Sequence, residues 1–298
     1  MNTALLKKLA RDPRGQEPAL ILGMSNEDYH AMTDVPSKSM LDLYAERPAK
    51  YRAKLDGTLE RKETESMRLG TAAHTALLEP HTWDARYRTL TEALSKNSNA
   101  YKALKAEEAE KGRVLIDQDE RDAAFKMAEA VMAKLDRIAG KVGGVNPFRL
   151  KGGICEGSLF WTDKATGLRL RTRPDWMIYQ EGGPNFIIDL KSTRDAGEGF
   201  DKSTENFRYD VSAAFYSDGY EAVFGVPPDA YLLVCVESGA PHFTCVRYAT
   251  PEILERGRKA YNKDTAGITS CQAANEWPDY PDDFVPMALP RWAKAERA

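Results

Sequence analysis

Seven consecutive residues decide the fold class of this chain: Asn185-Phe186-Ile187-Ile188-Asp189-Leu190-Lys191. The apolar run at their start predicts an extended strand. Side chains alternate between the two faces of a strand, so Asp189 and Lys191 point the same way while Ile188 and Leu190 point into the core. The predicted strand therefore places a carboxylate and an ammonium group on one small surface.

A second carboxylate, Asp175, lies 14 residues before Asp189, and a hairpin can bring the two together. Such a cluster can hold a hard divalent cation, with Lys191 beside a water molecule or a phosphate. This is the equipment for cutting a phosphodiester bond. Taken alone, the Asp-x-Lys pattern is more often a solvated ion pair on a strand face. The neighbouring residues decide between these interpretations.

Composition leaves the class of protein open. The 298 residues are 42% apolar, enough to bury a sizeable core, and we expect a short N-terminal tail (residues 1–21) followed by one domain (22–298). The net charge is only −3, so bulk charge neither supports nor excludes DNA as a partner. Any nucleic-acid groove must be a local basic patch.

The cysteines and the hydropathy pattern indicate a cytoplasmic location. Four cysteines are widely spaced without a Cys-x-x-Cys pair: Cys155, Cys235, Cys245 and Cys271. No signal peptide is recognisable, and no run of apolar residues reaches the length of a membrane span. We therefore expect a soluble protein in a reducing cytoplasm, without a membrane partner.

Helical and strand patterns alternate along the chain, which indicates the α/β class with a mixed central sheet flanked by helices. Helices are predicted at residues 37–55 (two short helices), 67–78, 117–139, 205–224 and 251–262. Strands are predicted at 158–161, 168–173, 185–191, 230–236 and 242–248, the first three as an antiparallel meander. Residues 95–112 are polar and rich in Lys and Glu, and are predicted to be a mobile excursion.

Three arginines recur at every second position of the second predicted strand: Arg169, Arg171 and Arg173. Asp175 has the same parity, so the arginines line up beside the acidic pair, provided that Pro174 does not bend the register. Guanidinium groups in this place can bind a phosphate backbone near the cutting site. The alternative is a solvated strand face balanced by nearby acids.

Five short motifs, in order along the chain, resemble the boxes of nucleases in the PD-(D/E)xK superfamily. They are Gly70-Thr71-Ala72-Ala73-His74, Glu156, Arg173-Pro174-Asp175, Asp189-Leu190-Lys191, and Tyr216 in Phe215-Tyr216-Ser217. More closely, the chain resembles the nuclease domain of the RecE-type exonucleases (exodeoxyribonuclease VIII), which are associated with prophages. This resemblance covers about residues 22–294 and implies a restriction-endonuclease-like fold. It includes segments outside the boxes, such as 24–30, 37–39, 208–226 and 289–294.

The resemblance implies a role for each residue of the boxes. His74, Asp175, Asp189, Glu156 and the backbone carbonyl of Leu190 would bind Mg²⁺, for which Mn²⁺ can substitute. Lys191 would orient or help to deprotonate the attacking water and counter the charge that develops on the phosphate.

Two residues of the boxes have an alternative structural interpretation, and one position departs from the pattern of the family. A histidine among small helical residues is by itself more often structural than a ligand, so His74 depends on the other boxes. Tyr216 would assist catalysis, although an aromatic residue in this context is equally typical of a core. Ser212 stands where the family has glutamine, four residues before Tyr216.

The implied activity is that of a double-strand DNA exonuclease. RecE-type enzymes degrade one strand in the 5′ to 3′ direction, leave a 3′ single-stranded tail for a RecT-type annealing protein, and form ring-shaped tetramers. We expect the same of this chain, with linear double-stranded DNA as substrate.

Two alternatives remain open from the sequence. A Cas4-like or helicase-associated nuclease would carry the same boxes, but many of those proteins bind an iron–sulfur cluster through closely spaced cysteines. This spacing is not found among the four cysteines, so no cluster is expected. The other alternative is a DNA-end-binding module that has kept the fold and lost cutting, and the intact His74, Asp175, Asp189 and Lys191 argue against it.

Overall fold

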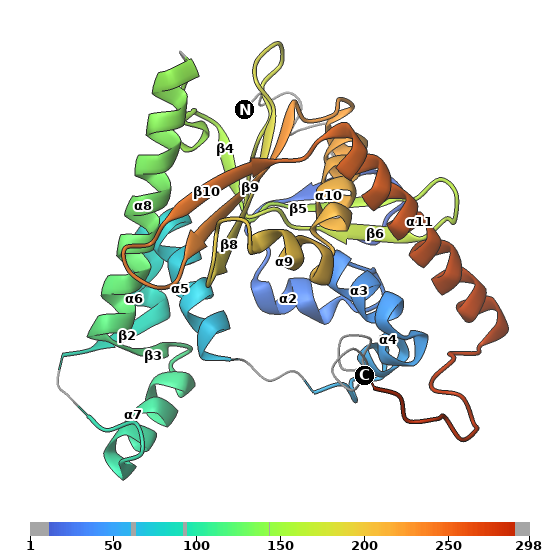
Figure 1. The fold of residues 1–298 in the computed structure, drawn as a ribbon, viewed down its shortest axis with the longest axis horizontal. Helices are drawn as coiled ribbons and strands as arrows, with labels where there is room; N and C mark the ends of the chain where they lie inside the picture. Colours follow the sequence, from blue (N-terminus) through green and yellow to red (C-terminus); the bar gives the residue numbers. More distant parts are fainter. Residues whose placement is uncertain (1–11, 61–63, 92–93, 143, 290–298) are drawn as a thin grey trace, which may run out of the picture.

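A five-stranded mixed sheet forms the centre of the molecule in the computed structural model, which describes residues 12–60, 64–91, 94–142 and 144–289 (Figure 1). Its strands run in the order β10 (Thr244–Tyr248), β9 (Ala230–Glu237), β8 (Phe186–Thr193), β7 (Trp176–Ile178) and β4 (Gly153–Cys155). β8 and β9 are parallel, and the other neighbours are antiparallel. The α/β class with a mixed sheet is confirmed.

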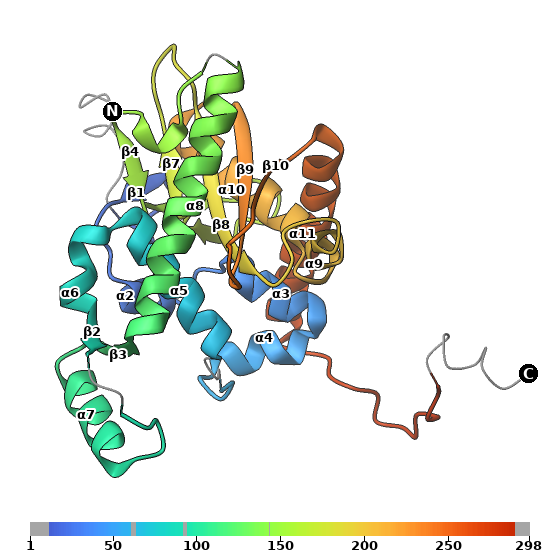
Figure 2. The same ribbon diagram turned by 60° about the vertical axis from the view of Figure 1, so that its left-hand side comes forward.

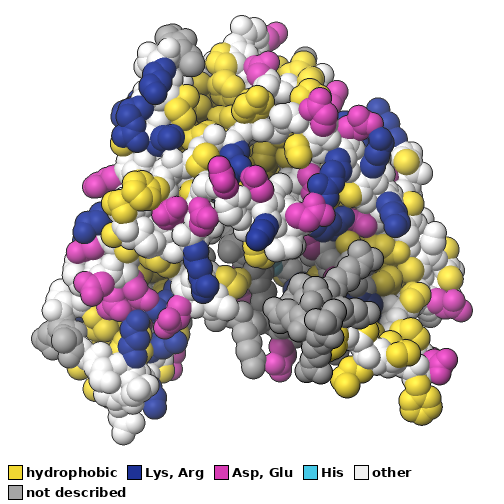
Figure 3. All heavy atoms as spheres, in the orientation of Figure 1, with side chains coloured by type: hydrophobic (Ala, Val, Ile, Leu, Met, Phe, Trp, Pro, Cys, Tyr) yellow, Lys and Arg dark blue, Asp and Glu magenta, His cyan; other side chains and the backbone are white. Residues whose placement is uncertain are grey.

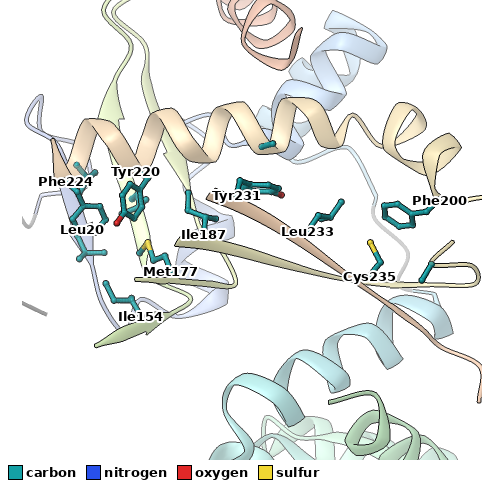
Figure 4. Packing of buried hydrophobic residues seen from close by; sticks show 14 residues of the cluster. Leu20, Ile154, Met177, Ile187, Phe200, Tyr220, Phe224, Tyr231, Leu233 and Cys235 are labelled. Atoms are coloured by element: carbon teal, nitrogen blue, oxygen red, sulfur yellow. The ribbon is translucent and has the colours of Figure 1, made fainter. Parts of the chain in front are cut away.

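Both faces of this sheet are covered by helices. On one face, Ile188 and Leu190 of β8 pack with residues of α5 (Glu65–Leu78) and α8 (Gln118–Val142). On the other face, Ile187 packs beneath α10 (Tyr209–Phe224), as Figure 4 shows. Strand β8 is therefore buried on both sides, and Asp189 lies on the face that α10 covers.

One long, bent hairpin joins the central sheet to a second sheet of three strands, with the order β1 (Ala19–Ile21), β5 (Ser158–Thr162) and β6 (Arg169–Thr172). The same register continues through both sheets, because Leu159 faces Thr172 in one and Cys155 faces Trp176 in the other. Between them the chain bends at Glu156, whose φ is +47°, and opposite it at residues 173–175.

The predicted meander of three strands is therefore wrong in one respect. The strand predicted at 168–173 pairs with β5 only. The antiparallel neighbour of β8 is instead β7, a strand that was not predicted. The reason is Pro174, which has no N–H to donate to a ladder and so interrupts the strand between β6 and β7.

The N-terminal region is part of the folded domain from residue 19, because β1 pairs with β5. Residues 19–21 of the predicted tail thus form a strand, and residues 1–11 of that tail lie outside the described residues. After β1 come α2 (Asn26–Ala31), α3 (Lys38–Glu46) and α4 (Pro48–Leu55). The last two are the predicted pair of short helices.

A small unit beside α5 and α8 contains a two-stranded parallel sheet, β2 (Tyr87–Leu90) and β3 (Val114–Asp117). Two short elements, η1 (Pro80–Thr82) and α6 (Trp83–Arg86), precede it. The predicted excursion at 95–112 holds α7 (Asn99–Glu110), which projects from the body in Figure 2. Ser98 caps this helix by accepting from the Tyr101 N–H, a signal the sequence analysis did not use.

The C-terminal half differs from prediction in two boundaries. The single helix predicted at 205–224 is two helices, α9 (Phe200–Asn206) and α10, because Arg208 adopts a left-handed conformation between them. The last helix, α11 (Pro251–Ala274), is longer than predicted. Earlier in the chain, the short helix η2 (Pro147–Arg149) follows α8. Most of segment 289–294, used in the resemblance, lies outside the described residues.

Nowhere in the described ranges does a helix combine the length and hydropathy needed to cross a bilayer.

Candidate active site

Asp175 and Asp189 face each other because of the register between β7 and β8. Trp176 pairs with Ile188, so extending that register by one residue sets Asp175 opposite Asp189. The Asp175 Oδ2 atom accepts a 2.6 Å hydrogen bond from the Leu190 N–H, which fixes the carboxylate against β8. The hairpin expected from the 14-residue spacing is therefore present.

The two carboxylates have opposite protonation tendencies. Burial raises the pKa of Asp189, and the nearby Asp175 adds to this against the opposing effect of Lys191. Burial would also raise the pKa of Asp175, but the positive charges of His74 and Lys191 outweigh it and lower that pKa well below its usual range. Without a bound cation, Asp175 is thus the more firmly ionised member of the pair.

Lys191 lies at the boundary between the carboxylates and solvent. Its Nζ donates to Asp189 Oδ1 over 2.7 Å and to the Leu190 carbonyl over 3.3 Å. Burial lowers the pKa of Lys191, but the charges of Asp189 and Asp175 outweigh this and raise it above its ordinary value. The side chain is therefore a fixed positive charge in this arrangement, suited to electrostatic stabilisation rather than to accepting a proton.

His74 joins the site from helix α5. Its Nε2 lies 3.0 Å from the Leu190 carbonyl oxygen, which can only accept, so Nε2 carries a proton. Its Nδ1 lies 3.5 Å from Asp175 Oδ1. Burial lowers the pKa of His74, but Asp175 outweighs this and raises it overall. The ring thus links two oxygen groups that are both predicted ligands.

A cleft of about 850 Å³ opens over these residues, and its lining includes His74, Glu156, Leu190 and Lys191. Glu156 reaches it from the bend of the long hairpin, where its backbone N–H donates to the Asp175 carbonyl over 3.1 Å. Burial raises the pKa of Glu156, and the negative charges of Glu79 and Asp175 add to this. Three of the five predicted ligand residues, His74, Glu156 and Leu190, therefore line this cleft. Asp175 and Asp189 are not in its lining, but Asp175 contacts both His74 and the Leu190 N–H.

Two residues of the cleft were missed by the sequence analysis. Arg86, at the end of α6, and Glu79 form an ion pair of 2.5 Å in its lining. The Arg86 side chain is 43% exposed, and Arg86 and Lys191 are the arginine and the lysine in the described lining. No local motif marks either residue, since only folding brings α6 beside the bend at Glu156.

Tyr216 and Ser212 lie on α10, on the covered face of the sheet. Tyr216 packs against the core, with its ring edge-on to Tyr231 at 6.2 Å between centroids. Ser212 is buried one turn earlier and does not line the cleft in the described chain. The hydroxyl that reaches the carboxylates belongs to Tyr231 of β9, which donates to Asp189 Oδ2 over 2.9 Å.

Tyr231→Phe tests whether this buried hydroxyl orients Asp189. Loss of such an outer partner typically weakens metal binding by about 10- to 100-fold, and we expect an effect in this range on Mg²⁺ and Mn²⁺ affinity. Isothermal titration calorimetry measures it directly. The matched control is Tyr220→Phe, which removes a buried hydroxyl that donates to the Ile178 carbonyl instead. Equal metal affinity for both variants would contradict the role of Tyr231.

A second lysine stands near the first. Lys38 donates to the Phe207 carbonyl over 2.6 Å and pairs with Asp42 at 2.8 Å. Both lysines approach the ring of Tyr209, whose centroid is 5.9 Å from Lys38 Nζ and 6.0 Å from Lys191 Nζ. Burial lowers the pKa of Lys38 despite Asp42. The signal that could have identified Lys38 is its place in the segment 37–39, which shares the resemblance.

The predicted basic strand face is corrected by the structure. Arg169 donates to the backbone carbonyls of Pro13 and Glu17, and Arg173 donates to Ser158 and to the Met24 carbonyl. Arg171 is 1% exposed and donates to the carbonyls of Met32 and Val35. The three guanidinium groups fasten the N-terminal region onto β5 and β6, because β6 turns away from the cleft at the Pro174 bend.

Arg171→Ala should therefore reduce stability, because it leaves two buried carbonyl groups without their donor. We expect the free energy of unfolding to fall by about 3 kcal/mol, as is typical for unsatisfied buried partners of a charged group. Urea denaturation measures the change. Arg169→Ala is the control, because the Arg169 side chain is only half-buried and water can replace it. Equal, small effects of both substitutions would contradict the structural role.

The donor set fits a hard divalent cation in its chemistry, because carboxylate and carbonyl oxygens are the ligands that Mg²⁺ prefers. Across the described ranges, however, no three His, Cys, Asp or Glu side chains are spaced to hold a metal ion by themselves. A cation at this site therefore depends on the Leu190 carbonyl and on Asp189 releasing Lys191.

Two facing carboxylates on a β-hairpin, a lysine two residues after the second and a mixed sheet between helices define the PD-(D/E)xK nucleases. A family model described as a PDDEXK-like domain of unknown function (DUF3799) matches residues 37–284, and the chain belongs to this family.

One solved structure agrees on the fold. A crystal structure of a candidate exonuclease from Eubacterium rectale is similar to this chain at a TM-score of 0.58 and 14% identity, covering 93% of this chain and all of its own. A Vibrio cholerae protein reaches a TM-score of only 0.22 at 10% identity, covering 84% of this chain and 61% of its own, and supports no argument. No curated protein matches the chain.

Proposed function

We propose that this chain is a Mg²⁺-dependent exonuclease that digests linear double-stranded DNA from 5′ to 3′ and leaves a 3′ single-stranded tail. The observation that carries the nuclease chemistry is the meeting of Asp175, Asp189 and the Leu190 carbonyl beside Lys191. The preference for ends and the polarity rest on the resemblance of the sequence to RecE-type exonucleases.

Different residues of the site would have different roles in hydrolysis. Asp175, Asp189 and the Leu190 carbonyl would hold Mg²⁺, with His74 and Glu156 beside them, and Mn²⁺ would substitute. The cation would supply Lewis-acid stabilisation of the phosphate and a more acidic water. Lys191, released from Asp189, would position the attacking water and counter the charge that develops on the phosphate.

The expected partner, oligomeric state and location of the protein come from the same resemblance. A RecT-type annealing protein would receive the 3′ tail, the enzyme would act as a ring-shaped tetramer in the cytoplasm, and no iron–sulfur cluster would be bound. The cleft contains few cations of its own, so phosphate binding there would rely on Arg86, Lys191 and the bound metal.

The proposal predicts that linear duplex is digested only when Mg²⁺ or Mn²⁺ is present, while covalently closed circular duplex of the same sequence survives. An exonuclease needs an end, whereas an endonuclease does not. Duplexes labelled at the 5′ or the 3′ end show which strand is shortened, and a chelator provides the metal-free control.

Each contrary result has a definite meaning. Rapid nicking or linearisation of the closed circle would overturn the end-dependent activity. Binding of linear DNA without cutting, with Mg²⁺ and Mn²⁺ both present, would identify a DNA-end-binding module. Early loss of the label from 3′ ends would reverse the proposed polarity.

A further inference from the structure

The last described segment of the chain is held at its base and exposed beyond it. Trp277 stacks on Tyr51 of α4 with 5.4 Å between ring centroids, and the Ala49 N–H donates to the Pro278 carbonyl over 3.1 Å. Arg47 lies 3.3 Å from the centroid of the Tyr280 ring. These contacts clamp residues 277–280 to α4 and fix the direction in which the following residues leave.

Residues 281–289, which we call the C-terminal arm, carry four large apolar side chains in solvent. Phe284 and Met287 are fully exposed, and Val285 and Leu289 are 69% and 59% exposed. Such a concentration of exposed apolar residues is typical of a surface that another molecule covers. Both views show the arm leaving the body on the side away from α8 (Figures 1 and 2).

An apolar groove lies on the other side of the molecule. It has a volume of about 490 Å³ between the C-terminal half of α8 and strand β10, and its lining includes Leu135, Ile138, Val145, Leu232 and Tyr248. Val145 and Tyr248 are 59% and 70% exposed. Figure 3 shows hydrophobic side chains gathered in a hollow at this place. We call it the α8–β10 groove.

The charges of the arm and the groove are complementary. Asp282 and Asp283 stand in the arm, and residues 276–289 contain no lysine or arginine. Lys134 and Lys141 precede Ile138 by four residues and follow it by three, so they flank it on the surface of α8. Neither lysine forms an ion pair with another residue of the described ranges.

We propose that the C-terminal arm of one copy of this chain docks into the α8–β10 groove of a second copy. The apolar side chains of the arm would fill the apolar groove, and the aspartates of the arm would pair with the lysines of α8. Because arm and groove are different surfaces on opposite sides of one body, the contact is head-to-tail, and the same pair of surfaces can join one copy to the next. This inference does not depend on nuclease activity.

A cross-linking experiment tests the contact itself. One preparation carries Phe284→Cys in the arm, and a second carries Val145→Cys in the groove. When the two are mixed and mildly oxidised, a disulfide-linked pair of chains should form. Phe243→Cys replaces Val145→Cys in the control, because Phe243 is 65% exposed and lies outside the groove. Equal yields for Val145→Cys and Phe243→Cys would overturn the proposal.

A second experiment tests the head-to-tail geometry by light scattering on a sizing column. The arm variant (Phe284→Asp with Met287→Asp) and the groove variant (Val145→Asp with Tyr248→Asp) should each have a lower mass than the wild type. Mixed together they should form dimers, because one intact groove meets one intact arm. Phe243→Asp should leave the mass unchanged. A monomeric wild type, or a mixture that fails to associate, would overturn the proposal.

Discussion

Asp189→Ala is expected to abolish both metal binding and cutting. Asp189 is 2% exposed and is held between Lys191 Nζ at 2.7 Å and the Tyr231 hydroxyl at 2.9 Å, so no other carboxylate can take its place. Loss of a direct ligand should exceed the roughly hundredfold upper range seen for an outer partner. Calorimetric titration with Mg²⁺ and Mn²⁺ beside an assay on linear duplex measures both effects, and added Mn²⁺ should restore little.

The substitution also leaves Lys191 and Tyr231 without their buried partner, so the fold must be checked separately. Asp189→Asn keeps the shape of the side chain and should give the same two losses with a smaller effect on stability. Asp201→Ala is the matched control, because this carboxylate is exposed, pairs with Arg247 and is not in the lining of the cleft. Undiminished metal binding by both Asp189 variants would remove this residue from the proposed ligand set.

Lys191→Ala is expected to separate cutting from metal binding. Cutting should fall by on the order of a hundredfold or more, the effect typical of removing one group that stabilises transition-state charge. Metal binding should be kept or strengthened. The structure explains the sign, because Lys191 occupies Asp189 Oδ1 and a cation no longer has to displace it.

The comparison that decides this prediction uses the same two measurements as for Asp189. Lys202→Ala, an exposed lysine of α9, controls for the loss of one positive charge from the surface. Because its carboxylate neighbours raise the pKa of Lys191, the ammonium stays charged at neutral pH, and its contribution should be electrostatic. Cutting by Lys191→Ala at nearly the wild-type rate would contradict the central assignment.

Local patterns in the sequence were sufficient for many of the elements, though not for β1, β4 or β7, and for the heart of the candidate site. Strand β8 was predicted from a continuous apolar run, because a strand buried on both faces of a sheet demands such residues. Strands β9 and β10 were predicted as well. The spacing of Asp175, Asp189 and Lys191 implied one hairpin and one face. That hairpin is present as the antiparallel pair β7 and β8. The shared face could be predicted because side chains of a strand alternate with a period of two.

Other features were decided only by the tertiary structure. The parity of Arg169, Arg171 and Arg173 was correct along a straight strand, but the bend at Glu156 and Pro174 moved that strand into another sheet, where the arginines bind backbone carbonyls. Tyr231 and Arg86 reach the site although they are 42 and 103 residues away from Asp189 in the sequence. Spacing along a chain encodes neighbours within a strand or a hairpin. It does not encode which distant segments pack together, because that depends on how all the apolar faces are buried at once.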